Sequence, residues 1–302
     1  MNNTQKSFYI LTIISVLIHA YGLLGQAIHL FQGSFLNWSN FGFIATTITS
    51  IFFTTAGVIG VIKFVTDENF YNKWLKAYAL MAAFYFVLYL PYNFSMMTGF
   101  HPAFKNGGIF ALGVFFLFQT IFSLIYFIVI IKHFSSEQKV FTHGPSIKKE
   151  ARFAHYLIDG LFIAITGFNF INSLGFLGGL THRVATNGLV SYMAIFFTLL
   201  VYYIVSEGIF KQSFGKLVTN HYVAHSNGSK ANFGNIVIRS LCRFIPFEIF
   251  SYLTSPMAKW HDKFSGTDVF EDFKTGEVMD YNNEYSTTTF DSETFDPGNW
   301  EE

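Results

Sequence analysis

Six long apolar stretches dominate this chain and restrict the folds that are open to it. They lie at residues 8–30, 41–63, 75–97, 108–131, 153–173 and 186–206. A helix needs about 20 apolar residues to cross the hydrocarbon core of a bilayer, and each stretch meets that length. Only 13% of the residues are charged, against about 25% in an average soluble domain. We therefore expect an all-α polytopic membrane protein with six transmembrane helices, arranged as four plus two.

The positive residues predict how these helices are oriented. Placing the N-terminus in the cytoplasm leaves Lys105 and Arg183 outside, and puts the other 17 of the 19 Lys and Arg residues inside. Lys and Arg are enriched in cytoplasmic loops. We therefore expect both termini on the cytoplasmic side of the plasma (inner) membrane. The run Phe8–Leu24 lacks a small-residue cleavage site after it, so we interpret it as the first span and not as a signal peptide.

Polar segments divide the chain into four parts. We expect an N-terminal four-helix membrane bundle at 1–131, a cytoplasmic linker at 132–150 and a second membrane domain at 151–270. The remainder, 271–302, is acidic: from Thr267 to the end there are 11 acids and one base. Such a composition is typical of a disordered tail.

Asp159 is a carboxylate inside the fifth apolar stretch, seven residues after Arg152. Seven residues are nearly two helical turns, so both charges lie on one face, with Asp159 roughly 10 Å further along the helix. An ionised group in hydrocarbon is costly and usually faces a partner or a wet cavity. Hydroxyl and amide side chains on the fifth and sixth stretches are equally consistent with ordinary contacts between helices.

The segment after the sixth stretch predicts a short cytoplasmic hairpin and an interfacial helix. Asn227-Gly228 is a strong two-residue turn signal between the arms 217–224 and 230–233. The segment 236–253 contains two arginines, a proline and an acid, which favours an amphipathic helix lying in the membrane interface. Its charged residues are Arg239, Arg243 and Glu248. The arginines either contact lipid phosphates, or one of them contacts Asp159 or Asp262.

These residues resemble the signature of the RDD family of membrane proteins. The signature is an Arg near the start of a membrane helix, an Asp within it, and a late Asp, here Arg152, Asp159 and Asp262. The Gly215-Lys216 step, the two arginines and the run R-x-L-C-R-F-I-P-F-E are also similar to that family. The resemblance covers roughly residues 150–270. It implies a membrane protein whose function is poorly defined, since some members are associated with sodium–proton exchange and a transport role is often supposed.

The N-terminal half resembles no family, but its polar residues follow helical seams. They suggest a left-handed bundle with a partly polar interior. Either these groups bond to one another, or they line a cavity for a ligand or ion. The candidate cavity residues are His19, Gln26, Tyr85, Tyr89 and Gln119. We expect no haem, because the histidines are not at matched depths, and no metal, because no ligand spacing supports one.

Two functions remain open from the sequence. The first is cation- or proton-coupled transport with Asp159 as the titrating group. The alternative is a non-transporting scaffold or accessory membrane protein, in which Arg152, Asp159 and Asp262 form a structural lock. No nucleophile, zinc-protease or acid-dyad motif predicts an enzyme. We expect the lipid bilayer and small cations or protons as partners, with no nucleic acid and no cofactor.

Overall fold

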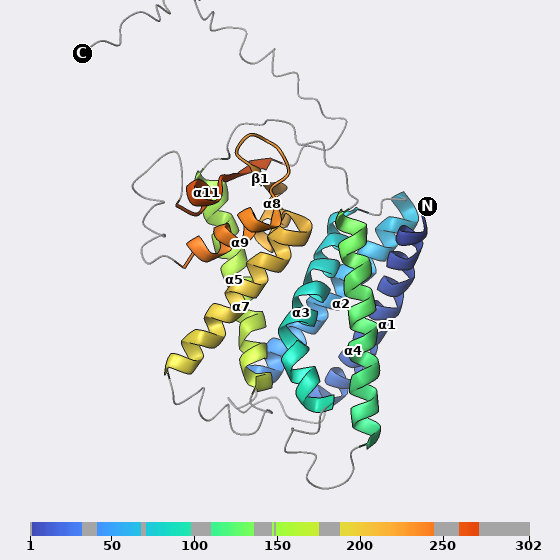
Figure 1. Cartoon of the computed structure of the whole chain (residues 1–302). Coiled ribbons are helices and arrows are strands. Elements are labelled where there is room, and N and C mark those ends of the chain that lie inside the picture. The colour runs from blue at the N-terminus through green and yellow to red at the C-terminus, as the bar shows by residue number, and fades with distance from the viewer. Residues whose placement is uncertain are drawn as a thin grey trace, which may run out of the picture. The chain divides into compact units, whose positions relative to one another are not determined.

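Six long helices form most of the structure. The computed structural model describes residues 2–31, 41–67, 71–97, 110–135, 147, 149–174, 188–244 and 260–271. The long helices are α1 (Asn3–Phe31), α2 (Phe41–Asp67), α3 (Lys73–Met97), α4 (Phe110–Ser135), α5 (Lys149–Leu174) and α7 (Gly188–Phe210) (Figure 1). Each expected stretch falls on one of them. Within the described residues, three segments are long and apolar enough to cross a bilayer, at Asn3–Ile28, Thr46–Asp67 and Leu117–Ser135.

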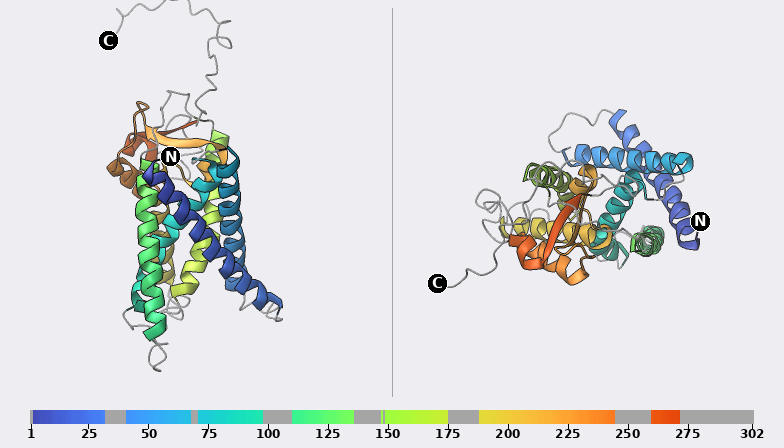
Figure 2. Two further views of the ribbon diagram at one scale, coloured as in Figure 1. Left: turned by 90° about the vertical axis from the view of Figure 1, so that its right-hand side faces the viewer. Right: turned by 90° about the horizontal axis from the view of Figure 1, so that it is seen from above.

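Helices α1 to α4 pack as a bundle, in which α1 and α3 each contact both α2 and α4 (Figure 2). Its buried polar groups bond to one another across helices. The Tyr78 hydroxyl donates to Ser15 Oγ over 2.7 Å, and the hydroxyls of Thr12 and Tyr126 lie 2.9 Å apart. Because lipid offers no hydrogen-bonding partner, such contacts satisfy groups that would otherwise be costly to bury.

A close approach between α2 and α3 depends on Gly60. A Cβ atom at this position would lie 2.8 Å from the backbone nitrogen of Leu75. The Asn72 side chain donates to the Gly60 carbonyl over 3.1 Å and accepts from the Leu75 N–H over 2.9 Å. Asn72 therefore caps the start of α3 and fastens it to α2.

The bundle and the C-terminal helices share one apolar core. Helix α3 contacts α7 and α2 contacts α5. The rings of Phe84 on α3 and Tyr202 on α7 meet edge to face, with centroids 5.5 Å apart. Of the expected linker at 132–150, residues 136–146 and 148 lie outside the described residues, as does the expected acidic tail from residue 272 onward.

In the described residues after α7, the C-terminal part has three short helices and two strands. These are α8 (Phe214–Thr219), β1 (His221–His225), α9 (Phe233–Cys242), α11 (Trp260–Ser265) and β2 (Thr267–Glu271). The strands pair antiparallel, with Val223 opposite Val269. Both valines are buried with Ala231 and Ile236 in a small second core.

The expected hairpin between 217–224 and 230–233 was wrong. A turn does form after β1, with Gly228 at φ 78° and its N–H donating to the His225 carbonyl over 2.8 Å. The chain beyond it gives β1 a single backbone bond, from the His225 N–H to the Ser229 carbonyl over 2.8 Å. It then enters α9, which Asn232 caps by accepting from the Asn235 N–H over 2.8 Å. The partner of β1 is instead β2, which lies at the C-terminal end of the described residues.

Helix α9 also differs from the expected interfacial helix at 236–253. It ends at Cys242, and residues 245–253, including Glu248, lie outside the described part of the chain. Its outward face is apolar, with Phe233, Ile238 and Leu241 exposed. Arg239 lies on the opposite face and is only 1% exposed, so its guanidinium is inside the protein and not exposed to lipid phosphates.

Candidate functional site

A buried glutamate organises the charged centre of the C-terminal part. Glu207, in the last turn of α7, is fully buried. It accepts from Lys216 Nζ over 2.7 Å, from Arg243 Nη2 over 2.7 Å and from Arg239 Nε over 3.1 Å. One carboxylate thus joins α7 to α8, to α9 and to the turn that follows α9.

Asp262 of α11 continues this arrangement. Its two carboxylate oxygens accept from the guanidinium groups of Arg239 and Arg152, and Arg152 also contacts Asp268 of β2. His261 Nε2 lies 3.4 Å from the Asp262 carboxylate. Burial raises the pKa of Asp262, but the positive charges of Arg239, His261 and Arg152 outweigh it, so the pKa lies below its usual range.

We call these seven paired groups the charge network. Its members are Arg152, Glu207, Lys216, Arg239, Arg243, Asp262 and Asp268. They come from α5, α7, α8, α9, α11, β2 and the turn after α9. Four cations face three carboxylates here, and the nearby carboxylate of Asp159 makes the total charge zero. Burying so many charges is tolerable only because each is paired in good geometry.

Asp159 lies beside the network but is held by neutral groups. Its Oδ1 atom accepts from the Tyr202 hydroxyl over 2.7 Å and from the Gly215 N–H over 2.7 Å. The expected pairing with Arg152 was therefore wrong, since Arg152 contacts Asp262 and Asp268 instead. The sequence placed both residues on one helical face, but other elements supply the partners of each.

The contact between α5 and α8 requires a glycine at 215. A Cβ atom there would lie 2.6 Å from the carbonyl oxygen of His155 and 2.8 Å from its Cα. This approach brings the Gly215 N–H to Asp159. It also gathers His155, Thr219 and His221, since His155 Nε2 lies 2.7 Å from Thr219 Oγ1 and 3.0 Å from His221 Nδ1.

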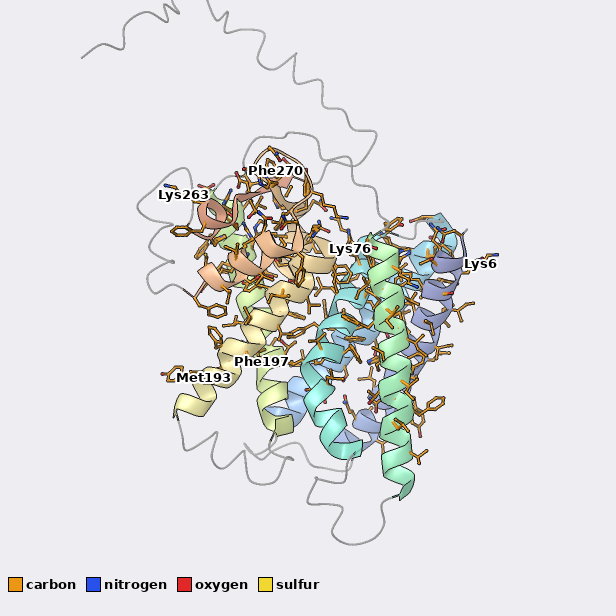
Figure 3. All side chains as sticks on the ribbon, in the orientation of Figure 1. Lys6, Lys76, Met193, Phe197, Lys263 and Phe270 are labelled. Carbon is orange, nitrogen blue, oxygen red and sulfur yellow. The ribbon has the colours of Figure 1, made fainter. Side chains whose placement is uncertain are left out.

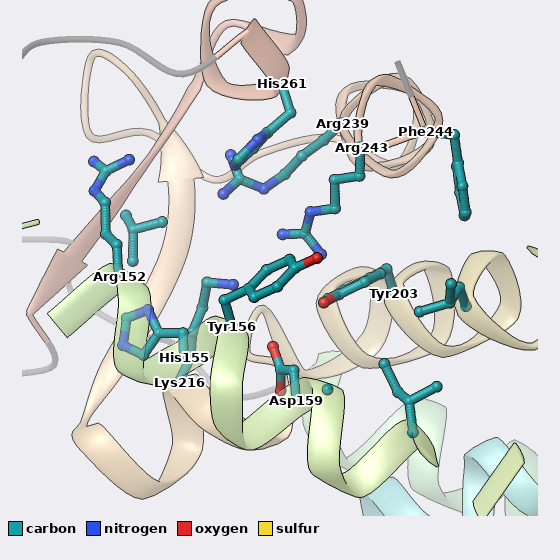
Figure 4. Close-up of a pocket in the computed structure, with 14 residues that line it drawn as sticks. Arg152, His155, Tyr156, Asp159, Tyr203, Lys216, Arg239, Arg243, Phe244 and His261 are labelled. Atoms are coloured by element: carbon teal, nitrogen blue, oxygen red, sulfur yellow. The ribbon is translucent and has the colours of Figure 1, made fainter. Parts of the chain in front are cut away.

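A cavity of about 180 Å³ lies between α5, α7 and α9 (Figure 4). Asp159 lines it, together with cations of the charge network, whereas Glu207 is not among its lining residues. The full lining is Arg152, His155, Tyr156, Asp159, Gly160, Ile163, Leu199, Tyr203, Lys216, Arg239, Arg243, Phe244, His261 and Val269. We call this space the α5–α9 cavity.

Burial and neighbouring charges shift the titration of the basic groups around this cavity. Burial lowers the pKa of Lys216 despite its pairing with Glu207. Burial also opposes the charge on Arg243, but Glu207 raises its pKa overall. Outside the cavity, burial and the charge of Lys230 lower the pKa of Lys211 to about 8. Arg243 therefore keeps its charge, whereas the lowered pKa values make the two lysines more easily neutralised.

The residues expected to line an N-terminal cavity contact neighbouring side chains or backbone, or lie at the surface. His19 Nδ1 lies 2.7 Å from the Ser15 carbonyl, and Gln26 donates to Ser50 over 3.2 Å. The rings of Tyr85 and Tyr89 pack together with centroids 5.6 Å apart. Gln119 is exposed on α4, so it does not belong to an interior seam. Among the described residues, no group of three or more His, Cys, Asp or Glu is placed to hold a metal ion.

The sequence alone did not identify two residues of the charge network, Glu207 and Asp268. Glu207 stands in the run V-Y-Y-I-V-S-E-G-I-F, so the criterion that singled out Asp159 also applies to it. Asp268 has no such signal, because it opens an acidic stretch in which every carboxylate is expected to be solvated. Lys216 was noted only as part of the Gly215-Lys216 step, which is similar to the RDD family.

Residues 150–266 match the RDD family. The comparisons with curated proteins and with solved structures gave no match. The matched segment contains Arg152, Asp159 and Asp262, the three positions on which the resemblance rests. It also contains Glu207, at which three of the cations meet. The C-terminal membrane segment of this chain, residues 150–266, is therefore similar to the RDD family of membrane proteins.

Proposed function

We propose that this protein is a six-span plasma-membrane protein with both termini in the cytoplasm, and that its RDD segment carries out proton- or cation-coupled transport. In this proposal Asp159 is the titrating group, and the chain has no enzymatic activity. The observation that carries it is the position of Asp159 on the α5–α9 cavity, where its hydrogen-bond donors among the described residues are neutral.

The orientation has support from the ends of the helices. The N-terminus, the C-terminal end of α4 and the beginning of α5 lie at the same end in Figure 1. Lys6, Lys76 and Lys263 lie at that end in Figure 3, and Met193 lies toward the other. This grouping agrees with the enrichment of positive residues on the cytoplasmic side.

The other carboxylates are poor candidates for titration. Glu207, Asp262 and Asp268 are all paired with Arg or Lys, and protonation of any of them would break at least one ion pair. Both hydrogen bonds that Asp159 accepts from the described residues end on Oδ1, which leaves Oδ2 available. It can gain a proton there without breaking an ion pair.

The surroundings of Asp159 favour a proton over a metal cation. Lys216 and Arg243 line the same cavity, and the charge of Asp159 influences the pKa of both. A bound Na⁺ or K⁺ would be repelled by these two charges, whereas a proton becomes part of the carboxyl group.

Flux measurements in proteoliposomes test the proposal. A pH gradient is imposed, and internal pH is followed for the intact protein and for Asp159→Asn. We expect flux with the intact protein and its loss with the variant. The control is Glu150→Gln, which removes an exposed carboxylate at the start of α5 and should leave flux intact. Unchanged flux in Asp159→Asn would refute the role assigned to Asp159.

The second candidate, a non-transporting accessory protein, also has a specific observation in its favour. Asp159 links α5 to α7 through Tyr202 and to α8 through Gly215, so it serves as a structural lock whether or not it titrates. This candidate expects no flux with the intact protein under any gradient. It also expects Asp159→Asn to lower the thermal unfolding midpoint.

A further inference from the structure

We infer that the α5–α9 cavity binds a phosphate-type oxyanion, with Arg243 as its principal ligand. The inference names the class of solute for the proposed transport. Only the statement that the anion is transported rests on the proposed function. The binding of the anion can be measured without any flux.

Arg243 is held in place with one donor unused. Its Nη2 donates to Glu207 over 2.7 Å, and its Cζ lies 3.6 Å from the centroid of the Tyr203 ring. Its Nη1 is buried and has no hydrogen-bond partner among the described residues. Leaving a buried donor without a partner is costly, so a ligand that accepts from Nη1 is favoured. Guanidinium groups are well suited to phosphate and carboxylate oxygens.

The cavity lining carries far more positive than negative charge. Arg152, Lys216, Arg239 and Arg243 line it, against the single carboxylate of Asp159. The side chains of Tyr156, Lys216 and Arg243 point toward its middle in Figure 4. The carboxylates of Glu207 and Asp262, which pair with these cations, are not among the lining residues. A ligand in the cavity therefore meets cations first, which favours an anion.

The volume restricts the size of that anion. About 180 Å³ corresponds to roughly six water molecules at their share of liquid volume. This is below the roughly 300–1,000 Å³ of pockets for drug-sized ligands. A single phosphate group fits in this volume.

Two sources can supply such a phosphate. Inorganic phosphate in the cytoplasm is one. The other is a lipid headgroup, since Phe233, Ile238 and Leu241 expose an apolar face of α9 and Phe244 lines the cavity itself. The recognition chemistry is the same in both cases, namely an oxyanion accepting from a guanidinium and an ammonium.

Asp159 connects anion binding to protons. With Asp159 ionised, it and the charge network sum to zero; with Asp159 protonated, they sum to one positive charge. The charged groups near Asp159 are Lys216 and Arg243, and its direct contacts are the Tyr202 hydroxyl and the Gly215 N–H. An anion therefore binds more tightly when Asp159 is neutral, which makes uptake of a proton and uptake of the anion mutually favourable.

Titration of the full-length protein with inorganic phosphate tests the site. The protein is placed in nanodiscs of phosphatidylcholine, and heat of binding and thermal unfolding are followed at constant ionic strength, with chloride as the control anion. We expect saturable binding of phosphate. Arg243→Lys keeps the charge but loses the planar fork, and should weaken binding by about tenfold. Absence of saturable binding, or equal affinity in Arg243→Lys, would overturn the inference.

Asp159→Asn is a second variant, for which we expect the opposite change in phosphate affinity. It removes the negative charge from the lining and should tighten phosphate binding by about tenfold at a fixed pH. Weaker binding in this variant would contradict the inference. If Asp159→Asn abolishes proton flux but the intact protein does not bind phosphate, the anion site is refuted and the proposed transport stands. If the intact protein binds phosphate but shows no proton flux, the anion site stands and the proposed transport is refuted.

Nanodiscs that contain phosphatidic acid distinguish the two sources. If a lipid headgroup fills the cavity, inorganic phosphate no longer binds in these discs, and native mass spectrometry detects one retained lipid that Arg243→Lys loses. If free phosphate is the ligand, its affinity is the same in both kinds of disc. Either result supports the site. Retention of phosphatidic acid to the same extent by Arg243→Lys, with no binding of inorganic phosphate, would refute it.

Discussion

Arg239 Nε donates a 3.1 Å hydrogen bond to Glu207 Oε2, and this contact fastens α9 to the last turn of α7. Arg239 is 1% exposed, and its guanidinium also contacts Asp262. Each of these groups would be very costly to bury alone. The docking of the short C-terminal elements on α5 and α7 therefore depends on charge pairing as well as on apolar contact.

Glu207→Gln should be among the most destabilising single substitutions in this segment. It keeps the shape of the side chain but removes the charge that pairs with Lys216, Arg239 and Arg243. Breaking a buried ion pair costs roughly 3–5 kcal/mol. Thermal unfolding in detergent measures the loss, and Glu150→Gln at an exposed position is the matched control. A midpoint equal to that of the control would show that the pairing contributes little.

Gly215→Ala tests the close approach of α5 and α8. The new methyl group would meet backbone atoms of His155 at 2.6 and 2.8 Å, and neither atom can move without shifting α5. We expect a loss of about 1–3 kcal/mol in unfolding free energy. Gly22→Ala, where no atom lies within 4 Å, should instead be neutral or stabilising by up to about 1 kcal/mol. Similar effects of the two substitutions would contradict the contact.

The role of β2 can be isolated by comparing two truncated chains, one ending at Glu271 and one at Gly266. The shorter chain lacks the strand that pairs with β1 and lacks Asp268, a partner of Arg152. We expect its unfolding midpoint to lie roughly 6–20 °C below that of the longer chain. Asp268→Asn in the longer chain separates the ion pair from the strand. Equal midpoints for the two truncations would show that β2 is dispensable.

Lys211 gives a prediction about pH. Burial and Lys230 lower its pKa to about 8 in the folded protein, against 10.5 for an ordinary lysine. Between these values the unfolded chain binds more protons than the folded one, so the folded state gains stability as pH rises. The stability difference between the intact protein and Lys211→Gln should therefore grow in favour of the intact protein from pH 8 to 10.5. A difference that stays constant over that window would exclude the shift.

The long helices were predictable because their signal is local. Each apolar stretch carries its own length and composition, and the structure has a helix at every expected place. The burial of Asp159 was predictable for the same reason, since a carboxylate within an apolar run must find partners inside the protein.

The partners themselves were not predictable, because they come from distant parts of the chain. Arg152 lies 110 residues from Asp262 and 116 from Asp268, and neither spacing leaves a periodic signal. The Asn227-Gly228 turn shows the same limit, since it specified a reversal of the chain correctly but not the strand that pairs with β1. Glu207 was overlooked because acids are common near the ends of membrane helices, where water is close.

The separation between Arg152 and Asp268 has a consequence for biosynthesis. Helices α5 and α7 leave the ribosome carrying Arg152 and Glu207 before α9, α11 and β2 have been made. Until residue 268 emerges, Arg152 lacks a carboxylate that the finished protein supplies, and it must stay in contact with water. Chains released early would therefore expose unpaired charge at the membrane surface, a feature by which quality-control proteases could tell them from complete molecules.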